Sequence, residues 1–151
     1  MALLSKAEAR AKWKVERASR NLWPSEAVCQ RLSTDPGFQA AKRVGLYASR
    51  LGEVDVSSLW RLRPEACVFP KVLSSTTMAF FSISDWTDLQ PGFAGILEPT
   101  RGTLVDQWEV GDWILVPGAA FDEKGGRAGS GAGFYDRFLV GLPVVPVGVC
   151  W

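Results

Sequence analysis

The chain of 151 residues contains no histidine, and this absence excludes several kinds of active site. A Ser-His-Asp triad, a Cys-His nucleophile and a His-ligated zinc ion all need an imidazole. Any chemistry must therefore use carboxylates, Lys, Arg, Tyr, backbone N–H groups or a bound cofactor.

Cysteine is scarce as well. The three cysteines, Cys29, Cys67 and Cys150, are far apart in the sequence. An odd number without a CxxC pair fits neither a disulfide framework nor a zinc site. We interpret all three as small buried apolar side chains.

Long apolar runs are also missing. No segment approaches the about 18–20 apolar residues that span a bilayer, and residues 1–12 lack the apolar core of a signal peptide. We therefore expect a cytoplasmic protein without a membrane partner. A hydrophobic content of 47% and a charged content of 22% are typical of a globular fold.

No charge of one sign dominates the chain, since 17 Lys and Arg oppose 16 Asp and Glu. Residues 1–50, however, hold ten basic side chains against four acidic ones, and the remainder holds seven against twelve. A sequence pI of about 7.7 lacks the basic excess typical of nucleic-acid-binding domains. We expect no nucleic-acid partner, and we treat the basic N-terminal segment as a candidate site for phosphate groups.

The pattern S-x-x-E at Ser5–Glu8 predicts a capping box that opens a helix extending to about Leu22. The apolar residues of this helix share one stripe: Ala11, Val15, Ala18 and Leu22. The basic residues share a second stripe: Lys6, Arg10, Lys14 and Arg17. We expect the apolar stripe to pack on the core and the basic stripe to face outward, as a solvated face or as an anion site.

Helical and strand patterns alternate along the rest of the chain. Helices are predicted over residues 25–32, 54–61 and 134–140. Strands are predicted over residues 43–48, 66–72, 78–83, 113–116 and 144–149. Turns are predicted at residues 35–37 and 122–126. This order predicts an α/β fold: a single three-layer domain with a mostly parallel central sheet flanked by helices.

The segment 127–136, RAGSGAGFYD, contains the largest group of candidate functional residues. Gly129, Gly131 and Gly133 alternate directly before a predicted helix, and glycine allows positive φ and close approach of the backbone to a ligand. Successive N–H groups in such a loop converge on an anion, and a helix start adds partial positive charge. The spacing predicts either a phosphate cradle or a mobile loop. It matches neither the P-loop nor the dinucleotide-binding fingerprint.

Three residues flank these glycines. Arg127 supplies a planar donor fork suited to phosphate or carboxylate, or is a surface cation. Asp136 is a natural Mg²⁺ ligand beside a phosphate site, or a first-turn helix acid. Tyr135 adds a ring and a hydroxyl to the site, or is a core aromatic.

Together these residues resemble the signature of the 5-formyltetrahydrofolate cyclo-ligase family, which is close to P-G-x-x-F-D-x-x-G-x-R-x-G-x-G-x-G-Y-Y-D-x-x-L. The matching residues are Pro117, Gly118, Phe121, Asp122, Gly125, Arg127, Gly129, Gly131, Gly133, Tyr135, Asp136 and Leu139. Three shorter motifs follow in the family's order: Lys6-x-x-x-Arg10, Tyr47 to Val54, and Gly95 to Pro99. The resemblance covers essentially the whole chain, which we expect to be one domain over residues 1–151, short at its C-terminus.

The resemblance implies a ligase that uses ATP and Mg²⁺ to cyclise 5-formyltetrahydrofolate to 5,10-methenyltetrahydrofolate, releasing ADP and phosphate. In the family's reaction the formyl oxygen is phosphorylated, N10 attacks the activated carbon, and phosphate leaves. Phosphoryl transfer needs positioning and charge neutralisation rather than a histidine base.

The resemblance also implies a role for each candidate site residue. The nucleotide would be bound by Lys6, Arg10, Arg127, Gly129, Gly131, Gly133 and Phe134. The folate would be bound by Glu53, Ser130 and Tyr135. Arg127 and Tyr135 would be catalytic, and Asp136 would hold Mg²⁺. We expect a monomer, and the alternative function is a non-catalytic family member that binds nucleotide or folate without turnover.

Overall fold

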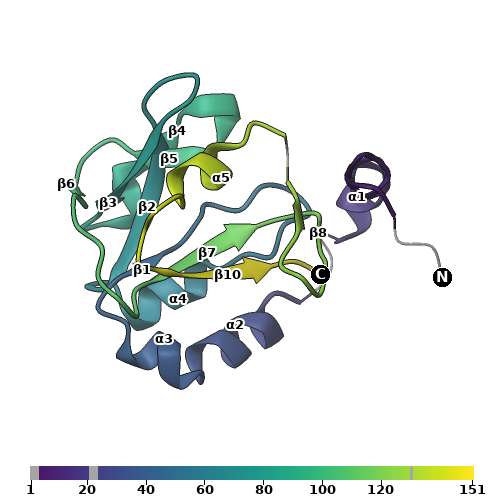
Figure 1. The fold of residues 1–151 in the computed structure, drawn as a ribbon. Helices are drawn as coiled ribbons and strands as arrows, with labels where there is room; N and C mark the ends of the chain where they lie inside the picture. Colours follow the sequence, from purple (N-terminus) through teal and green to yellow (C-terminus); the bar gives the residue numbers. More distant parts are fainter. Residues whose placement is uncertain (1–3, 21–23, 130) are drawn as a thin grey trace.

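The computed structural model describes residues 4–20, 24–129 and 131–151. Its centre is a six-stranded sheet in the order β10-β7-β1-β2-β3-β6 (Figure 1). The strands are β1 (Val44–Gly45), β2 (Cys67–Val72), β3 (Met78–Ser82), β6 (Thr103–Leu104), β7 (Trp113–Pro117) and β10 (Val145–Val149). Strand β1 pairs in parallel with β2 and β7, and β7 pairs in parallel with β10. The pairs β2–β3 and β3–β6 are antiparallel.

Helices cover both faces of this sheet. One face is covered by α2 (Glu26–Ser33), α3 (Pro36–Ala40) and α4 (Ser57–Leu62) (Figure 1). Their buried side chains Cys29, Phe38 and Leu59 belong to the larger hydrophobic core. On the other face lies α5 (Phe134–Phe138), where the ring centroids of Phe138 and Phe80 are 5.2 Å apart. The predicted three-layer α/β class is therefore confirmed.

Two small hairpins lie beside the main sheet. Strand β4 (Leu89–Pro91) pairs with β5 (Leu97–Pro99), and β8 (Ala120–Phe121) pairs with β9 (Arg127–Ala128). The short 3₁₀ turn η1 (Trp86–Asp88) precedes the first hairpin, and a second 3₁₀ turn, η2 (Phe93–Gly95), lies in the loop between its two strands. In the second, Asp122 Oδ1 accepts from the N–H groups of Lys124 and Gly126 at 2.9 and 2.7 Å. This confirms the turn at 122–126, which returns the chain to the end of β7.

Several boundaries differ from the sequence predictions. The expected turn at 35–37 is the start of α3, because Asp35 accepts from the Gly37 N–H and Pro36 suits the first helical position. The expected strand at 43–48 is reduced to β1, although the Leu46 N–H still donates to the Val68 carbonyl. The helix expected over 134–140 ends at Phe138. The short strand β6 carries no periodic signal, and it was not predicted.

Helix α1 (Lys6–Arg20) begins with the predicted capping box. The Glu8 N–H donates to Ser5 Oγ at 3.2 Å, and the Ser5 N–H donates to Glu8 Oε2 at 2.7 Å. The helix lies beside the β8–β9 hairpin and apart from the main body (Figure 1). None of the helices in the described ranges is long and apolar enough to cross a membrane.

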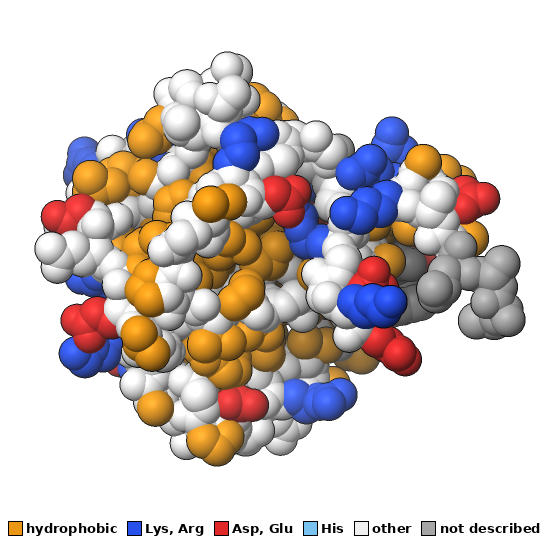
Figure 2. Space-filling model, in the orientation of Figure 1, with side chains coloured by type: hydrophobic (Ala, Val, Ile, Leu, Met, Phe, Trp, Pro, Cys, Tyr) orange, Lys and Arg blue, Asp and Glu red, His pale blue; other side chains and the backbone are white. Residues whose placement is uncertain are grey.

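The prediction that the apolar stripe of α1 packs on the core is wrong. Val15 is 84% exposed, whereas Trp13, which lies at the edge of the basic stripe, is 8% exposed. Burying one tryptophan removes more apolar area from water than burying alanine or valine. Trp13 therefore decides the rotation of the helix, and basic side chains lie on the side of α1 toward the body (Figure 2). The side chains of Arg17 and Ala18, and residue Leu22, lie outside the described part of the chain.

Candidate active site

An open pocket lies where α1, the loop after β1, the end of β7 and the loop before α5 meet. Six sequence-predicted residues line it: Glu53, Arg127, Gly129, Gly133, Phe134 and Tyr135. Two more, Arg10 and Asp136, contact lining residues directly. Lys6 and Gly131 are exposed and do not line the pocket, and Ser130 lies outside the described residues.

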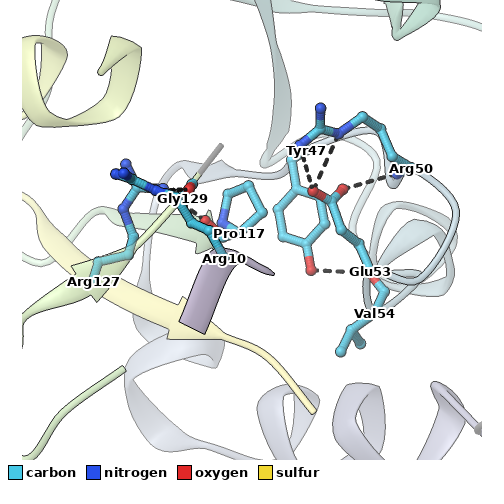
Figure 3. Close-up of polar contacts among 8 residues, drawn as sticks. All are labelled: Arg10, Tyr47, Arg50, Glu53, Val54, Pro117, Arg127 and Gly129. Atoms are coloured by element: carbon cyan, nitrogen blue, oxygen red, sulfur yellow. Dashed lines mark hydrogen bonds and ion pairs between the residues drawn. The ribbon is translucent and has the colours of Figure 1, made fainter. Parts of the chain in front are cut away.

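Arg10 joins the basic helix to the glycine-rich loop. Its Nε donates to the Gly129 carbonyl oxygen at 2.8 Å (Figure 3). Lys6 precedes Arg10 by four residues, so both side chains project from the same face of α1. The structure thus brings Arg10 of the basic helix and the glycine loop to one place.

Arg127 is held from several sides at the pocket wall. Its Nη1 donates to the Pro117 carbonyl oxygen at 2.9 Å, and its Nη2 pairs with Asp136 Oδ1 at 3.3 Å. The guanidinium carbon also lies 5.7 Å from the centroid of the Tyr135 ring. The planar fork is therefore preorganised at the place where the glycine loop begins.

The glycines of the loop are needed for different reasons. A Cβ on Gly129 would lie 2.2 Å from Arg127 Nη1, so this glycine makes room for the guanidinium. Gly131 has a φ of +100° and open space around its Cα, so its requirement is conformational. Any substitution at Gly129 must displace Arg127, whereas a substitution at Gly131 strains the backbone.

Glu53 lies on the opposite wall and is bound by Arg50. Its Oε2 accepts from the Arg50 backbone N–H at 2.8 Å, and its Oε1 accepts from Nε and Nη2 of Arg50 at 3.4 and 3.3 Å (Figure 3). Nearby, the Tyr47 hydroxyl donates to the Val54 carbonyl oxygen at 2.9 Å. These bonds fix the tight turn that presents the carboxylate to the pocket.

Tyr135 lies between these two walls. Burial raises the pKa of its hydroxyl far above the ordinary value of 10.0, and the nearby Glu53 carboxylate raises this pKa further. The positive charges of Arg127 and Arg50 act in the opposite direction but do not cancel these effects. Tyr135 therefore stays protonated at neutral pH and is a hydrogen-bond donor rather than a base.

Asp136 is the acidic side chain closest in sequence to the glycine loop, and it is 72% exposed. Among the described residues, no group of three or more Asp, Glu, Cys or His side chains forms a metal cage. Mg²⁺ is commonly held by one or two carboxylates together with substrate phosphates. A single accessible carboxylate beside a glycine-rich loop fits that kind of site.

The family model for 5-formyltetrahydrofolate cyclo-ligases matches residues 5–146. The chain belongs to this family. This confirms the resemblance carried by the Arg127–Asp136 segment and its accompanying motifs.

Several relatives agree with this assignment. A probable 5-formyltetrahydrofolate cyclo-ligase of Caenorhabditis elegans is 32% identical over 125 residues, covering 76% of this chain and 61% of the relative. The cyclo-ligase of Haemophilus influenzae is 33% identical over 123 residues, covering 74% of this chain and 64% of the relative. The chain thus spans less than two thirds of these two proteins.

A solved structure supports the fold. The NMR structure of 5,10-methenyltetrahydrofolate synthetase from Aquifex aeolicus superposes with a TM-score of 0.77 and 34% sequence identity. The match covers 98% of this chain and 78% of that one. The shared architecture extends from α1 through β10.

Sequence analysis did not select several residues that line this pocket. Trp13 and Arg50 line the pocket but belong to no recognised motif. A single large aromatic residue beside the basic stripe could have indicated that Trp13 is buried. Glu98 is buried, and its Oε1 accepts from the Val72 N–H at 3.1 Å. Phe93 packs on Phe134 with ring centroids 5.5 Å apart, and both rings line the pocket.

Proposed function

We propose that this chain catalyses the ATP- and Mg²⁺-dependent cyclisation of 5-formyltetrahydrofolate to 5,10-methenyltetrahydrofolate. The supporting observation is the bond from Arg10 to Gly129, which joins the basic helix and the glycine loop beside a pocket walled by Glu53. Family membership indicates the reaction. One half of the pocket carries groups suited to the nucleotide phosphates, and the other half is apolar and suited to the folate.

The nucleotide half uses cations from two elements. Lys6 and Arg10 would meet the triphosphate from α1, while Arg127 and the N–H groups of Gly129, Gly131 and Gly133 would meet it from the loop. Arg127 must first release Asp136, and an ion pair whose carboxylate is 72% exposed contributes little to stability. The freed Asp136 would then hold Mg²⁺, which supplies charge neutralisation at the phosphates.

The folate half uses apolar walls and few polar groups. Pro70, Val72 and Met78 provide apolar surface, and Phe93 and Phe134 flank the entrance. The Glu53 carboxylate would accept an N–H of the pterin. Such a wall, apolar with a few placed acceptors, is typical of sites for heterocyclic ligands.

Arg127 and Tyr135 would serve the chemical steps. Transfer of the γ-phosphoryl group to the formyl oxygen forms one O–P bond and breaks the bond to ADP. Attack by N10 on the formyl carbon then releases phosphate together with that oxygen. Arg127 would neutralise charge on the transferred group, and the protonated Tyr135 would donate a hydrogen bond at the formyl centre.

We further propose that residues 1–151 form one domain and act as a monomer on these small molecules, without nucleic-acid or membrane partners. The cytoplasmic location stays a prediction, since a relative from Arabidopsis thaliana is named as mitochondrial.

The direct test is the near-ultraviolet absorbance of the methenyl product. Purified protein with Mg-ATP and 5-formyltetrahydrofolate should give an absorbance increase that needs all three components. Arg127→Ala should abolish most of the rate, while Lys14→Gln, on the exposed part of α1, should keep it. Binding of both ligands without any absorbance increase would instead support the non-catalytic alternative.

A further inference from the structure

The side chain of Arg50 connects Glu53 with α1. The Arg50 guanidinium pairs with Glu53 and also lies over the ring of Trp13, with its central carbon 5.9 Å from the ring centroid. Trp13 is the buried residue by which α1 docks, and Arg10, three residues earlier on the same helix, binds Gly129. One helix thus contacts both walls of the pocket.

We propose that Arg50 is a positioning residue that holds the Glu53 carboxylate toward the pocket and makes its position depend on the docking of α1 through Trp13. This inference rests on the proposed function, because it assumes that Glu53 receives the folate. It adds a residue that the family signature does not contain and that sequence analysis did not select.

Burial explains why Glu53 needs Arg50. The Glu53 side chain is 9% exposed, and a carboxylate removed from water is costly unless it is paired and hydrogen-bonded. Without the guanidinium, only the Arg50 backbone N–H would remain of these bonds. The carboxylate would then turn toward water and lose its fixed direction.

The bonding pattern argues that Arg50 orients Glu53 and does not compete with a ligand for it. An ionised carboxylate accepts hydrogen bonds at about four positions. Arg50 supplies three N–H groups, one to Oε2 and two to Oε1. An acceptor position on Oε2 therefore remains for a ligand N–H.

Arginine is suited to this place because its planar guanidinium stacks by its face and donates from its edge. Stacking on an aromatic ring and forked donation to a carboxylate can occur together only in arginine. Lysine would keep the charge but lose the planar contact with Trp13. We therefore expect Arg50→Lys, which keeps the charge, to have a smaller effect than Arg50→Ala, which loses both the charge and the planar contact.

Kinetics of the full chain test this role. Arg50→Ala should raise the KM for 5-formyltetrahydrofolate about tenfold, as expected for losing a charge-assisted contact. It should raise the KM for ATP by a smaller factor than the KM for the folate, because Arg50 bonds directly to Glu53 and reaches the phosphate-binding Arg10 only through the docking of α1. Arg50→Lys should recover part of the loss. Arg101→Ala, an exposed arginine outside the pocket, is the matched control and should behave like the parent.

A double-variant cycle separates positioning from other roles. If Arg50 acts through Glu53, adding Arg50→Ala to Glu53→Gln should change the folate KM little beyond Glu53→Gln alone. If the effects of the two substitutions on the folate KM were fully additive, the proposal would be overturned, because Arg50 would then act on the substrate directly. A lower folate KM in Arg50→Ala would also overturn it, because Arg50 would then be blocking the site.

Hydrogen exchange of the ligand-free protein gives a readout that needs no substrate. Arg50→Ala should speed amide exchange in both α1 and the turn at residues 50–53, and Trp13→Leu should do the same, whereas Trp13→Phe should keep most of the protection. Unchanged exchange in Arg50→Ala would overturn the proposal. If the parent makes no methenyl product and binds no folate, the proposed function fails, and exchange still decides whether Arg50 links the two elements.

Discussion

Arg10 and Gly129 are 119 residues apart in the sequence, and the Nε of the first donates to the carbonyl oxygen of the second at 2.8 Å. Together with the burial of Trp13, this bond turns the side of α1 that carries Arg10 toward the pocket. Aligned cations repel one another on a helix, so a face that is both basic and inward favours an anionic ligand.

The first prediction concerns this bond. Arg10→Gln should lower the melting temperature of the free protein slightly and remove most of the stabilisation by Mg-ATP, because ligand stabilisation follows affinity. Relief of repulsion alone would raise stability by a few tenths of a kcal/mol, but loss of a bond worth about 1 kcal/mol reverses the sign. Lys14→Gln is the control, since Lys14 is exposed. Thermal melts with and without Mg-ATP should separate the two variants, and identical responses would contradict the site.

The second prediction compares two glycines of one loop. Gly129→Ala should weaken ATP binding about tenfold to a hundredfold, as Arg127→Ala should, because the added Cβ displaces the guanidinium. Combining the two substitutions should add little. Gly131→Ala should instead cost about 1 kcal/mol of stability through its positive φ, and Gly131→Val should cost more. Calorimetric titration and denaturant unfolding measure the two effects, and equal ATP affinities of parent and Gly129→Ala would rule out this explanation.

The third prediction concerns the state of Tyr135. Since burial raises the pKa of its hydroxyl well above 10.0, the group stays protonated between about pH 6 and 9 and adds no ionisation there. Tyr135→Phe should lower kcat by about tenfold or more through loss of a hydrogen-bond donor, with the shape of the pH profile unchanged. Rate measurements across this range check it. Disappearance of an ionisation step from the profile of Tyr135→Phe would show that the tyrosine acts as a base.

The fourth prediction concerns Asp136. Asp136→Asn should raise the Mg²⁺ concentration needed for half-maximal activity several-fold, because a carboxylate ligand becomes neutral. It should change the free energy of unfolding by less than about 1 kcal/mol, because the pair with Arg127 is exposed. Asp122→Ala, in the hairpin turn, should show the reverse pattern, since it removes the Oδ1 that accepts from two backbone N–H groups. A Mg²⁺ titration that does not distinguish the variants would remove Asp136 from the metal site.

Local signals in the sequence predicted much of the framework. The capping box at Ser5–Glu8, the hairpin turn closed by Asp122 and the glycine loop before α5 all depend on neighbouring residues. Such features can be predicted from the sequence because their hydrogen bonds join groups only a few residues apart. Element ends were predicted less well, as at 35–37, where Asp35 caps a helix instead of starting a turn.

The sequence by itself therefore determined the α/β class, the family and the residue types of the candidate site. Only the tertiary structure decided which face of α1 turns inward. The periodicity of Val15 and its neighbours predicts an apolar stripe, but it does not show that burying one tryptophan stabilises the protein more than burying that stripe of small side chains. It also decided that Arg50 joins Trp13 to Glu53, a contact between a helix and a distant turn that no local pattern records. Contacts of this kind depend on how the elements pack, and packing is a property of the whole chain.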